Sequence, residues 1–197
     1  MRDRRGQLFY DGRSPLVLAS ASPRRVALLT QVGLRFTVVD PGPDRDWPGD
    51  AEPRHGVRAL ALDKARRVAA RKPGAVVIGA DTVVVARGVR LGKPVSEEEA
   101  LATLKRLQGR THEVWTGIAV VRDREQRTAA ECTKVQFGRL DESELLAYVR
   151  TGEPLDKAGA YGIQGLGGAL VKRLEGDYFT VVGLPLHRLR LVLREFA

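Results

Sequence analysis

The sequence has little of several things that would place it in a particular class of protein. It contains one cysteine in 197 residues, which excludes an intrachain disulfide, and with only three histidines it offers little for a structural zinc site. No apolar run approaches the roughly 20 residues that a membrane-spanning helix needs. No hydrophobic segment follows the charged start of the chain, as it would in a secretory signal. We therefore expect a cytoplasmic protein that does not enter a membrane.

Aromatic residues are also scarce, at 6% of the chain, and they are scattered. Proteins that bind single strands usually stack bases on regularly placed aromatic side chains, so a stable nucleic-acid partner is not expected. The formal net charge of +9 still favours a polyanionic partner of some kind. Charge alone does not identify that partner, and it is equally consistent with a solvated basic surface.

Predicted strands and helices alternate along the chain, which is typical of the α/β class. We expect residues 1–14 to be an N-terminal extension that can be disordered, and residues 15–197 to form a single domain. Apolar runs predict strands at residues 16–19, 36–40, 75–79, 82–86, 111–121, 130–138, 169–174 and 178–182. Helical periodicity and end signals predict helices at residues 23–32, 56–71, 97–108, 141–151 and 185–196.

The segment at residues 20–25, Ser-Ala-Ser-Pro-Arg-Arg, joins a predicted strand to the start of a predicted helix. Ser22 can cap the helix and Pro23 suits its first position. Free amides and the helix dipole favour an anion at such a point, and arginine side chains match phosphate oxygens. The segment is therefore a candidate phosphate site, although an ordinary helix start with solvated arginines remains the alternative.

Asp81 follows a buried-looking strand and stands after Gly79 and Ala80. A carboxylate at a strand end, beside small residues that let a ligand approach, is a candidate magnesium ligand or general base. An ordinary turn aspartate is the alternative. Lys64 and Lys93 carry no signal of their own, because lone lysines usually lie at the surface.

Residues 159–168 (GAYGIQGLGG) are too rich in glycine for regular structure and too apolar for a solvated linker. The backbone of such a loop can approach a ligand closely, and the amide of Gln164 could read the edge of a base. A tight turn that requires positive φ angles is the alternative. The chain has neither a P-loop nor the Rossmann glycine fingerprint.

Taken in order, these segments resemble the Maf family of nucleotide pyrophosphatases. The resemblance runs through LVLASASPRR, LALDKAR, IGADTVV, LGKP, GRTHEVWTG, EPLDKAGAYGIQGLGG and DYFTVVGLPL, so that it covers nearly the whole chain after the first dozen residues. One such motif is weak, but their common order is specific. The DKAGAYGIQG segment is similar to the branch of the family that acts on dTTP and UTP.

The resemblance implies an elongated α/β fold with a central mixed sheet and a cleft between two lobes that takes the triphosphate. It also implies that Asp81 accepts the proton of the attacking water, and that Lys64 and Lys93 support the chemistry. Ser20, Arg24 and Arg25 would bind the phosphates, and Arg25 would share the selection of the base with Thr82 and Gln164.

The resemblance further implies a divalent cation, Mg²⁺ or Mn²⁺. Family members commonly carry a glutamate-containing acidic pair after the second strand, whereas this chain has Asp40, Asp44 and Asp46 there. Asp44 is our first choice as a ligand beside Asp81, although its side chain is shorter than a glutamate.

Two other functions stay open at this point. The chain could be a non-enzymatic regulator of cell division that binds nucleotides or nucleic acid, or it could perform the same reaction on a modified purine nucleotide. The presence of Asp81 among cationic residues favours the enzyme, because binding alone needs no carboxylate facing a phosphate. A homodimer is also open, since Tyr178, Phe179 and the last helix could pack in a core or against a second copy.

Overall fold

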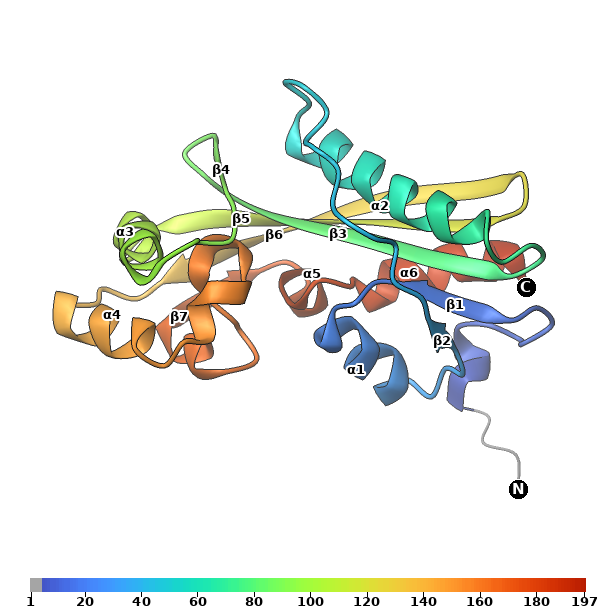
Figure 1. Cartoon of the computed structure of the whole chain (residues 1–197). Helices are drawn as coiled ribbons and strands as arrows, with labels where there is room; N and C mark the ends of the chain where they lie inside the picture. The colour runs from blue at the N-terminus through green and yellow to red at the C-terminus, as the bar shows by residue number, and fades with distance from the viewer. Residues whose placement is uncertain (1–4) are drawn as a thin grey trace. The chain divides into compact units, whose positions relative to one another are not determined.

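Helices pack on a seven-stranded mixed β-sheet across residues 5–197, the part of the chain that the computed structural model describes (Figure 1). The strand order is β2-β1-β3-β5-β6-β7, and β4 pairs with β3 outside that order. The strands are β1 (Leu16–Ala19), β2 (Thr37–Val38), β3 (Val76–Ala86), β4 (Val89–Leu91), β5 (Thr111–Arg122), β6 (Glu125–Phe137) and β7 (Val171–Glu175).

The α-helices are α1 (Pro23–Gln31), α2 (Pro53–Ala69), α3 (Glu97–Leu107), α4 (Glu142–Val149), α5 (Tyr178–Val182) and α6 (Leu186–Leu193). Short 3₁₀ helices are η1 (Arg5–Leu8), η2 (Glu153–Asp156), η3 (Ala158–Ala160), η4 (Leu166–Leu170) and η5 (Arg194–Phe196). The predicted α/β class, with a mixed sheet flanked by helices, is confirmed.

The chain forms two compact units. Unit 1 contains the described residues up to Asp81 together with Thr116–Glu131 and Gly183–Ala197, and unit 2 contains Thr82–Trp115 and Cys132–Val182. Strands β3, β5 and β6 therefore contribute residues to both units.

In unit 1, strand β1 pairs in parallel with β2 on one side and with β3 on the other. Both faces of β1 are covered, and all four of its residues are buried. Helix α2 lies on one face of this part of the sheet and α1 on the opposite face (Figure 1). Val17 and Ala19 of β1 join Ala61, Ala65 and other apolar side chains in the core beneath α2.

Two glycines let α2 approach the sheet closely. A Cβ atom on Gly79 of β3 would overlap the carbonyl oxygen of Ala61 and lie 3.0 Å from the Cβ of Ala65. A Cβ atom on Gly117 of β5 would overlap the carbonyl group of Val57. Because these glycines lack side chains, the backbone of α2 lies directly on β3 and β5, and this fixes where its inward-facing residues lie.

In unit 2, β4 pairs antiparallel with β3, and β7 pairs antiparallel with β6. Helices α3 and α4 bury Leu104 and Leu145 in a core that also holds Val135, Phe137 and Tyr161. Helix α4 begins with a capping box, in which the Asp141 carboxylate accepts the Glu144 amide and the Glu144 carboxylate accepts the Asp141 amide. Such a cap stabilises a helix start, because it satisfies amides that have no partner within the helix.

Two of the predicted elements are wrong. Residues 178–182 form helix α5 rather than a strand, because the Asp177 carboxylate accepts both the amide and the hydroxyl of Thr180 at 2.8 Å. This local cap outweighs the strand propensity of Tyr, Phe and Val. Residues 76–86 form one continuous strand, so the predicted interruption at residues 79–81 does not exist.

The start of the described chain packs against the rest of unit 1. Phe9 and Tyr10 are buried, and the Tyr10 hydroxyl donates to the Ser14 carbonyl oxygen at 3.1 Å and accepts the Ser14 amide at 2.9 Å. Residues 1–4 of the predicted extension lie outside the described residues. Over residues 5–197, no helix has the length and apolar character needed to cross a membrane.

Candidate active site

Lys64 is a buried cation held between two carboxylates. It lies on α2 and is 7% exposed. Its Nζ atom donates to Asp81 Oδ1 at 2.6 Å and lies 2.7 Å from Asp44 Oδ1. A buried ammonium needs such partners, because the loss of its hydration costs several kcal/mol. The structure thus brings together three residues that the sequence singled out separately.

Asp81 lies within β3, on the segment against which α2 packs. Its side chain is 14% exposed, and its pairing with Lys64 follows from the close approach of α2 over Gly79. The prediction that Gly79 leaves room for a ligand is wrong, because Ala61 and Ala65 of α2 occupy that space. Asp81 is also not at a strand end but in the middle of a continuous strand.

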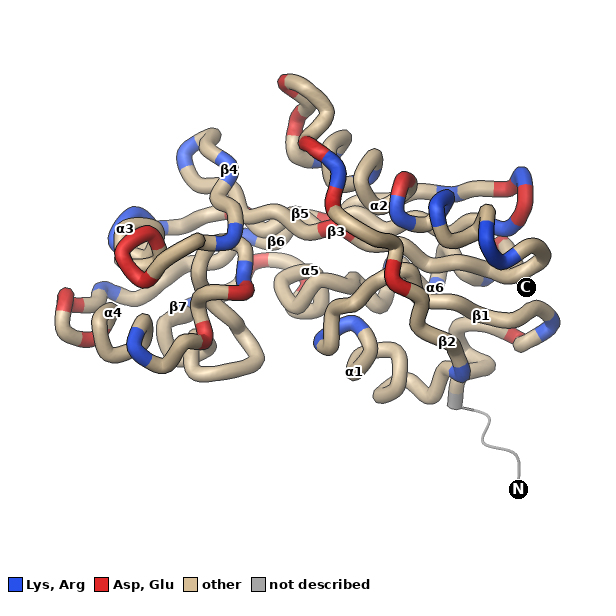
Figure 2. Tube along the Cα trace, viewed as in Figure 1, with Lys and Arg blue, Asp and Glu red and all other residues tan. Residues whose placement is uncertain are grey.

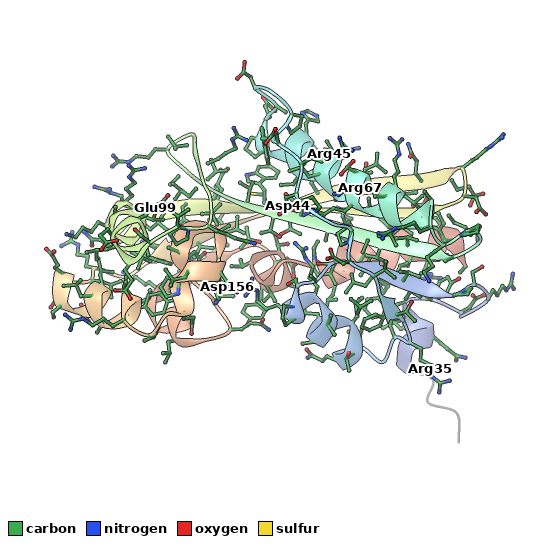
Figure 3. The ribbon with its side chains drawn as sticks, in the orientation of Figure 1. Arg35, Asp44, Arg45, Arg67, Glu99 and Asp156 are labelled. Carbon is green, nitrogen blue, oxygen red and sulfur yellow. The ribbon has the colours of Figure 1, made fainter. Side chains whose placement is uncertain are left out.

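Asp44, which is labelled in Figure 3, lies on the loop that connects β2 with α2, and its carboxylate pairs with Lys64 from there. The Arg67 Nη1 atom donates to the Pro43 carbonyl oxygen at 3.0 Å, and Arg71 Nη2 donates to the Asp40 carbonyl oxygen at 2.7 Å. Arg45, on the other side of Asp44, pairs with Asp63 at 3.4 Å. Residues of α2 and its C-terminal end therefore hold this loop on both sides of the Asp44 carboxylate.

The connection from β1 to α1 presents Ser20, Arg24 and Arg25, and Figure 2 shows the basic segment at the start of α1. The buried Ser20 accepts the Ser22 amide at 3.2 Å and the Arg25 Nη1 atom at 3.0 Å through its Oγ atom. Arg25 Nε donates to the Gly183 carbonyl oxygen at 2.8 Å. The prediction that the Ser22 side chain caps α1 is wrong, because it makes no cap hydrogen bond.

Arg25 links this segment electrostatically to the two aspartates. Burial lowers the pKa of its guanidinium, and the positive charge of Arg24 lowers it further. The negative charges of Asp81 and Asp44 raise this pKa but do not cancel the effect of burial. An arginine remains protonated in spite of such an effect. Unit 1 contains all six of these residues, Ser20, Arg24, Arg25, Lys64, Asp44 and Asp81, so cationic side chains and carboxylates belong to the same unit.

Unit 2 contains the remaining predicted residues, Thr82, Lys93 and Gln164. Lys93 and Gln164 are exposed, and their side chains have no hydrogen-bond or ion-pair partner among residues 5–197. The Gly159 amide donates to the Gly92 carbonyl oxygen at 3.0 Å, which ties the segment of Lys93 to the glycine-rich segment. The side chains of Lys93 and Gln164 are therefore exposed to solvent on two segments whose backbones are joined by this hydrogen bond.

Asp44 and Asp81 fit a divalent cation. Their carboxylates converge on the single Nζ atom of Lys64, so two hard oxygen donors lie close to each other. Mg²⁺ at nucleotide sites is commonly held by one or two carboxylates, while phosphates and waters complete its shell. Among residues 5–197 there is no cluster of three or more His, Cys, Asp or Glu side chains that could hold a metal.

Sequence reasoning missed two groups that organise these segments. Arg67 and Arg71 hold the Asp44 loop, but nothing in their spacing distinguishes them from a solvated basic face. Glu153 and Tyr148 bind the segment around Gln164. Glu153 stands at the start of the EPLDKAGAYG motif, which was the only signal available for it, and Tyr148 had none.

The chain shares its architecture with a solved structure of low sequence identity. The Staphylococcus aureus Ham1 protein matches 93% of this chain over the whole of its own length, with a TM-score of 0.51 and 15% sequence identity. At that identity the match shows the fold and nothing more.

The family is shown by closer matches. The model of the Maf-like protein family matches residues 15–196, and the chain belongs to this family. The dTTP/UTP pyrophosphatase of Symbiobacterium thermophilum is 52% identical over 92% of this chain and 93% of its own. Its counterpart from Moorella thermoacetica is 53% identical over 93% of this chain and 95% of its own. The resemblance found in the sequence is confirmed.

Proposed function

We propose that the protein is a nucleoside triphosphate pyrophosphatase that hydrolyses dTTP and UTP to the monophosphate and pyrophosphate. The observation that carries this proposal is the identity of about half of all residues with proteins named dTTP/UTP pyrophosphatase, over more than nine tenths of both chains. The pairing of Lys64 with Asp44 and Asp81 beside Arg24 and Arg25 supports it, because such a set can bind a triphosphate and hydrolyse it.

In this proposal the start of α1 binds the phosphates. Arg24 and Arg25 supply positive charge, and the first amides of the helix point toward an anion. Ser20 holds Arg25 in place through its Oγ atom. Lys64 and Lys93 neutralise further negative charge on the phosphates. In phosphoryl transfer, most of the rate gain comes from positioning and from such stabilisation of charge.

Asp81 orients the attacking water and accepts its proton. The water oxygen forms a bond to the α-phosphorus, the bond from that phosphorus to the bridging oxygen breaks, and pyrophosphate leaves with the electron pair. The products are the nucleoside monophosphate and pyrophosphate, and the proton of the water is taken up by the Asp81 carboxylate. Lys64 fixes the orientation of that carboxylate by donating to its Oδ1 atom at 2.6 Å.

Asp44 and Asp81 would hold the divalent cation, Mg²⁺ or Mn²⁺. When bound, this ion neutralises phosphate charge and supports the departure of pyrophosphate. The convergence of the two carboxylates on Lys64 supports this assignment.

The base is selected by Gln164, with Thr82 and Arg25 contributing. The Gln164 amide offers one acceptor and two donors, which is the pattern needed to pair with a carbonyl and an imino group on uracil or thymine. Cytosine presents the opposite pattern at the corresponding atoms, so Gln164 discriminates between the two bases only if its amide is held in one of its two orientations.

The experiment is to measure pyrophosphate release from dTTP, UTP, CTP, ATP, GTP and modified purine triphosphates, with Mg²⁺ and with Mn²⁺. We expect release from dTTP and UTP, and a loss of about 10²–10⁴-fold in the Asp81→Asn variant, since that is the usual contribution of a general base. The introduced amide keeps an oxygen that accepts from Lys64, so the fold should persist. Asp50→Asn, in the exposed loop before α2, serves as the matched control.

Three outcomes would contradict the proposal in different ways. Turnover of purine triphosphates alone would reject the pyrimidine specificity. Near-normal release by Asp81→Asn would remove Asp81 from the catalytic role. Absence of release from every nucleotide by a folded protein, together with salt-dependent binding of long DNA or RNA, would favour a binding regulator instead.

A further inference from the structure

The segment at residues 162–167 is held from both sides of Gln164. Gln164 itself is exposed, and its side-chain amide has no hydrogen-bond partner in the described chain, residues 5–197. An exposed glutamine on an irregular loop normally samples many positions, which costs binding energy when one position is required. The backbone around Gln164, in contrast, is fixed by two side chains from other elements.

Glu153 of η2 binds the backbone that follows Gln164. Its Oε2 atom accepts the Leu166 amide at 2.9 Å, and its Oε1 atom accepts the Gly167 amide at 3.0 Å. One carboxylate thus accepts two consecutive backbone amides, and hydrogen bonds to a charged acceptor are about twice as strong as neutral ones.

Tyr148 of α4 binds the backbone that precedes Gln164. Its hydroxyl accepts the Gly162 amide at 3.1 Å and donates to Glu153 Oε1 at 2.8 Å. The two side chains therefore form a continuous chain of hydrogen bonds from Gly162 through Tyr148 and Glu153 to Leu166 and Gly167. Tyr148 is 5% exposed and belongs to the core of unit 2, so this chain is anchored to a rigid element.

Three glycines of the loop lie close to the side chains of Glu153, Tyr148 and Lys157. A Cβ atom on Gly165 would overlap the Glu153 carboxylate, and one on Gly167 would lie 2.5 Å from the Tyr148 hydroxyl. A Cβ atom on Gly162 would lie 2.5 Å from Lys157 Cε, whose Nζ atom donates to the Glu153 carbonyl oxygen at 2.7 Å. The glycine pattern that the sequence displays thus reflects close contact with Glu153, Tyr148 and Lys157.

The charge of Glu153 suits this role. Burial acts to raise the pKa of its carboxyl, but the amides of Gly167 and Leu166, the Tyr148 hydroxyl and the charge of Lys157 outweigh that effect, and the net result is a lowered pKa. The carboxylate is therefore ionised at neutral pH, and it accepts from the two amides and the Tyr148 hydroxyl at once.

We propose that Glu153 and Tyr148 are positioning residues that hold residues 162–167 so that Gln164 can discriminate between bases. This proposal rests on the proposed function for the identity of the ligand. Neither residue touches the nucleotide in it. They act through the backbone of Gln164, and their removal should weaken the discrimination between uracil and cytosine more than it slows the reaction.

The test compares Glu153→Gln with the matched control Glu142→Gln, which removes a surface charge of α4 that pairs with Lys105 of α3 in the same unit. A glutamine keeps one acceptor oxygen but faces one of the two amides with its own NH₂ group, so one backbone bond is lost. We expect the ratio of kcat/KM for UTP over CTP to fall about 10-fold, through KM rather than kcat. We expect hydrogen exchange at Leu166 and Gly167 to accelerate by a similar factor, with no change in the control.

Tyr148→Phe is the second variant, since it preserves packing and removes only the hydroxyl. We expect faster exchange at Gly162 and a smaller loss of discrimination. In a Gln164→Ala background, Glu153→Gln should cause no further loss of discrimination, because residues that act through one another are not additive.

The two proposals can fail separately. If the wild-type protein releases no pyrophosphate, the proposed function fails, and calorimetric affinities for UTP and CTP still test the positioning role. If Glu153→Gln accelerates exchange but keeps the wild-type preference for UTP, the contact is merely structural and the positioning role is overturned. Unchanged exchange at Leu166 and Gly167 would overturn it as well.

Discussion

Lys64 shows how one side chain organises the candidate site. Its ammonium is buried and touches both Asp44 and Asp81. Removing one partner of a buried pair leaves a charge without full compensation, which commonly costs about 3–5 kcal/mol. Because Lys64 retains a second carboxylate when either aspartate is replaced, the two aspartates can be tested individually without the loss of the fold.

Asp44→Asn should weaken the response to Mg²⁺. The variant removes one of two carboxylates proposed to hold the cation, so we expect the Mg²⁺ concentration for half-maximal activity to rise at least about 10-fold. Asp46→Asn, an exposed aspartate of the same loop, is the matched control. Titration of pyrophosphate release with MgCl₂ measures both, and equal curves for the two variants would remove Asp44 from the metal site.

His112 makes the stability of the protein depend on pH. It is 2% exposed, its Nε2 atom lies 2.9 Å from the Tyr161 hydroxyl, and its Nδ1 atom has no hydrogen-bond partner within residues 5–197. Burial lowers its pKa from 6.5 to about 4. Between these values the unfolded chain binds a proton that the folded chain excludes, so the stability contributed by neutral His112 is complete above pH 6.5 and is lost as the pH falls toward 4.

The expected size of this effect is about 2 kcal/mol of unfolding free energy between roughly pH 7.5 and pH 5. Urea unfolding at both pH values, for the wild type and for His112→Phe, measures it. The variant leaves the Tyr161 hydroxyl without this partner and should be less stable at the higher pH, but its loss between the two pH values should be smaller by about that amount. An equal loss in both proteins would show that other groups cause the acid sensitivity.

At the scale of elements, helix α2 and strand β3 decide the geometry of the site. Gly79 of β3 sets the distance between them, because the backbone of α2 at Ala61 and Ala65 packs directly against this glycine. Helix α2 carries Lys64 and Arg67, and Arg71 follows its end. A small displacement of this one helix would therefore move the ammonium away from Asp81 and loosen the loop of Asp44 together.

Gly79→Ala should reduce both stability and activity. Its Cβ atom would overlap the Ala61 carbonyl oxygen, and we expect a destabilisation of about 1–3 kcal/mol, as for other overpacked cores. Gly138→Ala is the control, because its Cβ atom would meet only the Leu170 carbonyl oxygen at 3.8 Å. Thermal unfolding and pyrophosphate release measure the two effects, and a Gly79→Ala protein with wild-type values would show that α2 does not need this close approach.

At the scale of the whole molecule, the charge of +9 attracts every polyanion, not only the substrate. Figure 2 shows basic and acidic segments distributed along the chain in both units. Many basic side chains also form hydrogen bonds within the protein, as Arg58 does with Thr128 and Arg66 with Gln126. This distribution of charge favours a weak, non-specific attraction of nucleic acid to the protein over binding at a specific basic surface.

Binding to single-stranded DNA should therefore be weak and strongly dependent on salt. We expect the affinity for a short oligonucleotide to fall about 10-fold or more between roughly 50 and 200 mM salt, as counterion release requires. Fluorescence anisotropy measures this fall, with dTTP hydrolysis at the same salt concentrations for comparison. Tight binding that persists at the higher concentration would instead indicate a specific nucleic-acid partner.

Much of the architecture could be read from local patterns. Strand β1, the start of α1 after Ser22, the Ser96 cap of α3 and the helix at α4 each follow from features within a few residues. Residues 178–182 show the limit of this reasoning, since strand-forming side chains became a helix once Asp177 capped Thr180. Propensity is a weak preference that a single good cap can outweigh.

The amino-acid order alone, through its alternating elements and its motifs, was enough to assign the α/β class and the Maf family, because both depend on short-range patterns. The tertiary structure alone decided which charges meet. Lys64 and Asp81 are 17 positions apart on different elements, and their contact depends on the packing of α2 over Gly79 of β3. The contacts of Glu153 with Leu166 and Gly167 likewise required the folded loop. Such contacts join residues that are distant in sequence, and no local pattern encodes the distance between them.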